Sequence, residues 1–355
     1  MGRFAPLKKG IVERKGIFVV GAARSGTTLL RLLINNHPDI ACIGETQFFH
    51  HNYLQLSNNQ AYNLQLLDHI FKTESEVPDL LNDLQLEKDL SNIKTVAEYF
   101  DFLLSTYSNK LGKKYWAEKS PSHVIRLNAM SQMFPDIRVV NIIRNPYFSA
   151  ISSFKKLKHS QISNFSLITY IKYIKRVEDE LVSFQSMNNN SLITIRYEDL
   201  SSVPLGVITK VFKFLEVDSS VVNSEFLKIS KKNIPVSSDG EEQEHHSRVG
   251  EKLTESIYDI DEYFSAFQLY LFSTELNNSI IFKDYIENNK ESNFIFFLRK
   301  ALLDCLYSFI GIPMYRLRRL VNQIKSSLKR ILSSIIFVNL LFYSITILFS
   351  TVPSS

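Results

Sequence analysis

Apolar and polar residues alternate along the chain in blocks that predict strands and helices in turn. Short runs rich in β-branched and aromatic residues are typical of buried strands, and between them apolar residues recur at helical spacing. Strands that alternate with helices indicate an α/β fold with a parallel sheet. We therefore expect about five parallel strands with helices on both faces. The predicted strands are Ile17–Val20, Ile40–Ile43, Tyr115–Glu118, Arg138–Ile143 and Leu192–Arg196.

Helical spacing predicts the elements that cover this sheet. In the segment 96–111, Phe100, Leu103, Leu104 and Tyr107 recur at helical intervals. Ser120 can cap a helix that has Pro121 in its first turn. The predicted helices cover residues 29–36, 96–111, 124–133, 146–159, 165–187, 204–215 and 219–229.

The turn after the first strand predicts a site for an anion. Gly21 and Gly26 bound a run of small and hydroxyl residues that leads into a helix, where N–H groups and the helix dipole favour negative charge. A nucleotide P-loop carries Lys after the second Gly, but Thr27 stands there. That Lys contacts the β- and γ-phosphates of a triphosphate, and no strand ends in an Asp that would hold Mg²⁺. Arg24 instead places a cation inside this P-loop-like turn, which suits a shorter phosphate without metal.

Two further cations follow predicted strands. Lys119 ends the third strand and Arg144 follows the fourth. Ligands of open α/β sheets bind at the carboxyl ends of the strands. An Arg can contact a phosphate with two hydrogen bonds, and Ser152, two turns into the next helix, can add a hydroxyl.

These motifs resemble the sulfotransferases that use 3′-phosphoadenosine-5′-phosphosulfate (PAPS). The run 23–30 is similar to their 5′-phosphosulfate loop, and the Arg144-Asn145-Pro146 … Ser152 pattern is similar to their 3′-phosphate site. The run through His37-Pro38 and 44–46 resembles tyrosylprotein sulfotransferases, as does Lys119 with the following Pro121. Residues 45–49 also resemble heparan sulfate sulfotransferases. The resemblance extends over residues 17–253, in scattered motifs.

The resemblance implies a reaction. A sulfonyl group would move from PAPS to an acceptor hydroxyl without metal, leaving adenosine 3′,5′-bisphosphate. Glu45 would be the general base. Lys119 and Arg24 would contact the sulfonyl group and the leaving phosphate. The residues implied to bind PAPS are Arg24, Ser25, Gly26, Thr27, Thr28, Arg144, Ser152, Arg248 and Gly250.

Two further motifs need separate comment. The late loop 247–250 resembles the one that closes over the adenosine, but Glu251-Lys252-Leu253 follows it where family members carry an aromatic residue or Lys. The run 197–200, Tyr-Glu-Asp-Leu, is also similar to sulfotransferases. We interpret its carboxylates as structural groups that orient Arg side chains near the site.

The acceptor stays open among a glycan, a lipid or small alcohol, and a polypeptide tyrosine. Gln47 stands where tyrosylprotein enzymes carry an Arg that helps to bind acidic peptides, which weakens the tyrosine interpretation. Two alternatives belong to other classes. One is a P-loop kinase of a small molecule, and the other is a non-catalytic, membrane-tethered nucleotide-binding protein.

Composition narrows the partners. The chain has 355 residues, enough for one large domain and an appendage, and its net charge of +5 suits anionic ligands better than nucleic acid. Two cysteines, Cys42 and Cys305, form neither a disulfide framework nor a metal-ligand cluster. The adjacent His245 and His246 lack the further ligands of a metal site.

The two ends of the chain differ. Residues 1–15 are polar and basic, unlike a signal peptide or N-terminal anchor. Residues 331–352 carry no charge, match the roughly 20 residues that cross a bilayer, and follow a basic band at 316–330. The positive-inside tendency then places the catalytic domain on the cytoplasmic side of a membrane. A buried helical hairpin or an interfacial helix is the alternative.

The predicted division is a catalytic domain over 1–290, with an insertion at about 50–112 over the acceptor site, and a helical, membrane-associated tail over 291–355.

Overall fold

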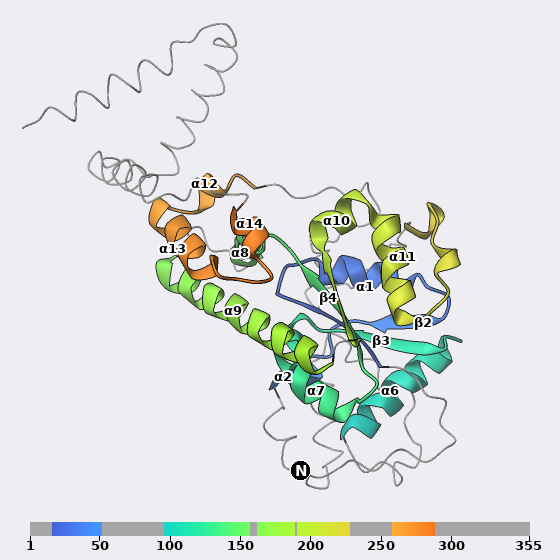
Figure 1. The fold of residues 1–355 in the computed structure, drawn as a ribbon. Helices are drawn as coiled ribbons and strands as arrows, with labels where there is room; N and C mark the ends of the chain where they lie inside the picture. The colour runs from blue at the N-terminus through green and yellow to red at the C-terminus, as the bar shows by residue number, and fades with distance from the viewer. Residues whose placement is uncertain (1–15, 52–95, 157–161, 189, 228–257, 288–355) are drawn as a thin grey trace, which may run out of the picture. The chain divides into compact units, whose positions relative to one another are not determined.

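The computed structural model describes residues 16–51, 96–156, 162–188, 190–227 and 258–287 (Figure 1). The chain divides into two compact units. The first comprises Met1–Tyr258 and Glu275–Asn288, and the second comprises Asp259–Thr274 and Asn289–Ser355. The candidate site residues that the structure describes all lie in the first unit.

The first unit is built on a five-stranded parallel sheet with the order β2-β3-β1-β4-β5. This confirms the α/β fold and the number of strands that the sequence predicts. Pairing places Val19 of β1 opposite Lys119 of β3, and Gly21 of β1 opposite Ile142 of β4. The carboxyl ends of these strands therefore meet at one edge. The strands are β1 (Ile17–Gly21), β2 (Ile40–Ile43), β3 (Tyr115–Lys119), β4 (Arg138–Ile143) and β5 (Leu192–Arg196).

Helices cover both faces of the sheet. On one face lie α1 (Thr27–Asn35), α10 (Tyr197–Ser202) and α11 (Pro204–Leu215). On the other lie α2 (Phe48–His51), α6 (Val96–Lys110), the 3₁₀ turn η1 (Pro121–Arg126), α7 (Leu127–Met133) and α9 (Asn164–Met187) (Figure 1). The other helices described in this unit are α8 (Pro146–Lys156) and α14 (Lys283–Glu287).

Alternate residues of β1 point to opposite faces of the sheet and pack into the hydrophobic core on each face. Ile17 and Val19 pack under α1, whereas Phe18 packs with Trp116 and Phe100 on the opposite face. The Phe18 ring centroid lies 5.4 Å from that of Trp116 and 6.0 Å from that of Phe100. The helical spacing predicted for 96–111 thus marks the buried face of α6. Residues 52–95 of the predicted insertion lie outside the described residues.

Two local predictions are wrong. The described part of the predicted helix 219–229, residues 219–227, does not form one, because side chains take the backbone donors: Asp218 accepts the Ser220 N–H and Asn223 accepts the Phe226 N–H. Single 3₁₀ turns, Ser219–Val221 and Glu225–Leu227, form instead. Ser120 precedes η1 without capping it. Its hydroxyl instead donates to Glu118 and accepts the Gln47 N–H.

The described part of the second unit is helical. It contains α12 (Ile260–Tyr263) and most of α13 (Ala266–Leu276), with Phe264 and Phe272 in edge contact. Among the described helices, none has the length and apolar character to cross a bilayer. The predicted spanning segment 331–352 and the rest of the predicted tail lie outside the described residues.

Candidate functional site

The turn between β1 and α1 accepts only glycine at its two ends. A Cβ on Gly21 would lie 2.4 Å from the Ile142 carbonyl oxygen, which belongs to the neighbouring strand. Gly26 has φ of 100°, and a Cβ there would lie 2.4 Å from the Tyr197 ring. The two glycines therefore bring the turn close against β4 and Tyr197.

This turn presents hydrogen-bond donors without acceptors. The backbone N–H groups of Gly26, Thr27 and Thr28 find no acceptor among the described residues. The hydroxyl of Ser25 is fully buried and likewise lacks a partner there. The N–H of Ala23, by contrast, donates to the Tyr173 hydroxyl at 3.3 Å, so α9 anchors the start of the turn. A helix N-terminus with orphaned donors of this kind suits an anion.

Two arginines lie beside these donors. The Arg24 guanidinium donates through Nε to the Ser152 hydroxyl at 3.1 Å. The buried Arg144 side chain stacks on the Tyr197 ring, 4.4 Å from its centroid, and approaches the Arg24 carbonyl oxygen at 3.5 Å. Burial lowers the pKa of Arg24, and the neighbouring Arg144 cation lowers it further. Arginine side chains carry a positive charge in proteins, so an anion near both would relieve their mutual repulsion.

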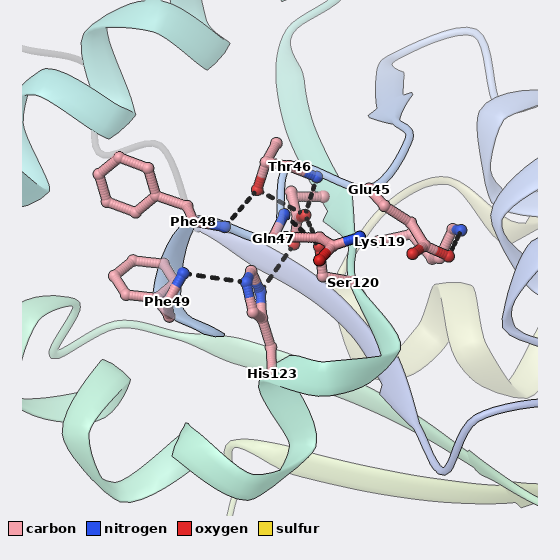
Figure 2. Close-up of polar contacts among 9 residues, drawn as sticks. Glu45, Thr46, Gln47, Phe48, Phe49, Lys119, Ser120 and His123 are labelled. Atoms are coloured by element: carbon pink, nitrogen blue, oxygen red, sulfur yellow. Dashed lines mark hydrogen bonds and ion pairs between the residues drawn. The ribbon is translucent and has the colours of Figure 1, made fainter. Parts of the chain in front are cut away.

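A carboxylate and an ammonium group meet next to this turn. Lys119 Nζ forms an ion pair with Glu45 Oε1 (Figure 2). The Lys119 side chain is buried, while that of Glu45 is 20% exposed, so the carboxylate is the member of the pair that solvent reaches. The structure thus brings Glu45, in the loop after β2, together with Lys119 at the end of β3, and Lys119 lies beside β1 just before the turn.

The loop after β4 is held by hydrogen bonds that the sequence does not predict. Glu198 accepts the Asn145 N–H at 2.9 Å and the Tyr285 hydroxyl at 2.6 Å. Burial, and then the hydrogen bond to Glu198, raises the pKa of Tyr285, so its hydroxyl stays a donor at neutral pH. Glu198 therefore fixes the backbone next to Arg144, a different structural role from the side-chain contact that we predicted. No sequence signal links positions as distant as 198 and 285.

Two of the predicted residues cannot be placed. Arg248 and Gly250 lie outside the described residues. Within the described part of the chain, no group of three or more His, Cys, Asp or Glu side chains is arranged to hold a metal ion. The described site consists of the turn 21–28, Arg144 with Ser152, and the Glu45–Lys119 pair.

A family model described as "Sulfotransferase family" matches residues 16–220, more than half of the chain. The chain belongs to the sulfotransferase family. The match covers every candidate site residue except Arg248 and Gly250, and it confirms the resemblance found in the motifs.

Individual relatives are distant. This sulfotransferase-family chain is 24% identical over 229 residues to a protein-tyrosine sulfotransferase of Drosophila melanogaster, covering 62% of this chain and 42% of that protein. It is 23% identical over 208 residues to protein-tyrosine sulfotransferase 2 of Gallus gallus, covering 58% and 52%. The chain thus spans about half the length of these curated relatives or less. A solved sulfotransferase structure from Alicyclobacillus acidocaldarius aligns with a TM-score of 0.43 and 16% identity, covering 81% of this chain and 99% of that one.

The turn geometry makes a prediction about stability. Gly26→Ala should lower the free energy of unfolding by more than the about 1–2 kcal/mol that a positive φ costs an L-residue, because its Cβ would also displace the Tyr197 ring. Gly112→Ala is the matched control, since Gly112 has φ of 68° but open space around its Cβ position. Urea unfolding of both variants measures the difference. Equal losses would show that Tyr197 does not press on the turn.

Proposed function

We propose that this chain transfers a sulfonyl group from PAPS to an acceptor hydroxyl. The observation that carries the proposal is the position of the Glu45–Lys119 pair beside an anion-binding turn whose donors lack partners among the described residues. Such a transfer needs two parts: a carboxylate that can take a proton, and a binding site for the leaving phosphate. Family membership supports the same reaction class.

The residues of the turn fit a phosphate. We assign the 5′-phosphosulfate to Arg24, Ser25, Gly26, Thr27 and Thr28, because orphaned N–H groups and the buried Ser25 hydroxyl surround that point. We assign the 3′-phosphate to Arg144 and Ser152, which approach the turn from β4 and α8. Arg248 and Gly250 complete the assignment on sequence resemblance alone. Binding of this ligand needs no metal, since arginines and backbone dipoles supply the positive charge.

PAPS supplies an activated sulfonyl group, and the protein supplies proton transfer and charge. Glu45 accepts the proton of the acceptor hydroxyl as the new sulfur–oxygen bond forms. Lys119 and Arg24 stabilise negative charge on the sulfonyl oxygens and on the phosphate oxygen released as the old sulfur–oxygen bond breaks. Adenosine 3′,5′-bisphosphate and the sulfated acceptor are the products.

The acceptor in this proposal is a hydroxyl of a glycan, of a lipid or small alcohol, or of a polypeptide tyrosine. Two relatives are named protein-tyrosine sulfotransferases. Gln47, at a position where the resemblance implies Arg in tyrosylprotein enzymes, supports a less acidic acceptor. We also propose that the tail 291–355 tethers a catalytic domain formed by 1–290 to a membrane from its cytoplasmic side.

The first prediction from this proposal concerns the 3′-phosphate. Arg144→Ala should weaken binding of adenosine 3′,5′-bisphosphate roughly 10- to 100-fold, through loss of a charge-assisted hydrogen bond, and should change 5′-AMP binding little. Calorimetric titration in a chelator measures both ligands. Arg138→Ala is the control, because Arg138 begins the same strand at its opposite end. Equal losses for the two ligands would place Arg144 away from the 3′-phosphate.

A second prediction concerns the general base. Glu45→Gln keeps the shape of the side chain but cannot take a proton, so turnover should fall about 10²- to 10⁴-fold while bisphosphate affinity stays near that of the wild type. Transfer of ³⁵S from labelled PAPS is measured with a tyrosine-containing peptide, octyl glucoside and octanol as acceptors. Glu275→Gln, which alters an exposed partner of Lys175, is the control for the substitution itself. Wild-type turnover in the Glu45→Gln variant would remove this carboxylate from the mechanism.

A third prediction concerns the tail. Truncation after Pro313 should move the protein from the membrane to the soluble fraction and leave bisphosphate binding intact, because it removes the uncharged segment and the basic band. Each basic residue near an anionic surface contributes about 1 kcal/mol. Fractionation with and without a high-salt wash separates surface binding from a span. Loss of nucleotide binding on truncation would make the tail part of the catalytic core.

A further inference from the structure

A fully enclosed polar network lies behind the Glu45–Lys119 pair, on the opposite side of the end of β3. Glu118, at its centre, is completely buried, as are Ser120 and His123, and Thr46 is 1% exposed. Glu118 Oε1 accepts hydrogen bonds from the Thr46 N–H at 3.0 Å, the Thr46 hydroxyl at 2.8 Å and the Ser120 hydroxyl at 2.5 Å. Glu118 Oε2 lies 3.1 Å from His123 Nδ1.

The same network holds the backbone of the loop after β2. The Gln47 N–H donates to the Ser120 hydroxyl at 2.9 Å, and the Phe48 N–H donates to the Thr46 hydroxyl at 3.3 Å. The Phe49 N–H donates to His123 Nε2 at 3.2 Å (Figure 2). Four consecutive N–H groups, from Thr46 to Phe49, are therefore fixed by side chains of this network.

The hydrogen-bond directions fix the state of His123. Because His123 Nε2 accepts from the Phe49 N–H, the ring proton lies on Nδ1, which is 3.1 Å from Glu118 Oε2 without a hydrogen bond between the two atoms. Burial by itself would raise the pKa of Glu118, but His123 and the hydrogen bonds from Ser120 and Thr46 hold it below its ordinary value. Glu118 is thus a buried carboxylate with three hydrogen bonds to Oε1 and the His123 ring beside Oε2.

Chain geometry links this network to the Glu45–Lys119 pair. Thr46 directly follows Glu45, and Glu118 and Ser120 flank Lys119. Since successive strand residues point to opposite faces, Glu118 lies on the aromatic side of the sheet and Lys119 on the side of the turn. Gln47 has φ of 50°, so the loop between Thr46 and Phe49 takes a strained form that needs support. Apolar residues of similar size often give a protein the same stability as buried charged groups. A contribution to stability alone therefore does not explain the buried Glu118.

We propose that Glu118, Thr46, Ser120 and His123 are positioning residues that hold Glu45 and Lys119 in register for sulfonyl transfer. The network connects the backbone next to the base with the backbone on both sides of the lysine. This inference rests on the proposed function, and it adds residues that act through Glu45 rather than on the substrates.

The test compares two substitutions of Thr46 in the full chain. Thr46→Val nearly keeps the shape of the side chain, and Thr46→Ser keeps the hydroxyl. Valine removes the hydroxyl that contacts Glu118 and the Phe48 N–H, whereas serine keeps it. With ³⁵S-labelled PAPS and whichever of the three acceptors reacts fastest, kcat of Thr46→Val should fall roughly 10- to 100-fold with bisphosphate affinity unchanged. Thr46→Ser should stay close to the wild type. Amide hydrogen exchange should rise at residues 46–49 in the valine variant only.

A double-mutant cycle separates positioning from general damage. In the Glu45→Gln background, Thr46→Val should cost little further activity, because its effect passes through Glu45. The inference is overturned if the valine variant keeps wild-type kcat, if serine loses as much as valine, or if the loss in kcat is the same in both backgrounds. A wild-type protein that moves no label from PAPS to any of the three acceptors overturns the proposed function itself, and the positioning role with it.

Discussion

Parallel pairing of β1 with β3 and β4 is the constraint on which the site depends. It places Val19 beside Lys119 and Gly21 beside Ile142, so the turn, the lysine and Arg144 all emerge at one edge of the sheet. The same pairing makes glycine obligatory at position 21, because the Ile142 carbonyl fills the space of a Cβ. A slip of one residue in the pairing of β1 with β3 would move Lys119 to the aromatic face and Glu118 to the site.

Charge is arranged in two opposite ways around this edge. On the side of the turn, Arg24 and Arg144 lie close together beside donors that lack acceptors among the described residues, an arrangement that is incomplete without an anion. On the aromatic side, Glu118 is a buried carboxylate that accepts three hydrogen bonds from Thr46 and Ser120 and lies against the His123 ring. The first arrangement suits binding and release of a ligand, and the second suits a rigid support. The boundary between them is the peptide segment from Glu118 to Ser120.

The sequence predicts the elements that depend on local pattern. All five strands could be predicted, because each is a short, largely apolar run; four are buried almost throughout, and β5 is partly exposed at Thr194. Glu45, Lys119, Arg24, Arg144 and Ser152 could be chosen because the motifs that contain them resemble those of PAPS-dependent sulfotransferases, and the structure places them in contact as two groups. Contacts of side chains with distant positions could not be predicted: Tyr285 with Glu198, Tyr173 with the Ala23 N–H, and His123 with the Phe49 N–H carry no periodic signal. The helix expected at 219–229 failed for the related reason that Asp218 and Asn223 compete for backbone donors.

The central claim is that the group transferred is a sulfonyl group and that the donor is PAPS. A dual-label experiment tests it most directly. The purified full chain is incubated with ³⁵S-labelled PAPS, γ-³²P-labelled ATP with Mg²⁺, and a lysate that contains candidate acceptors. The account predicts ³⁵S in an acceptor product, with no ³²P transferred above the level of a lysate without the protein. Protein-dependent transfer of ³²P without ³⁵S would contradict it and would favour a kinase.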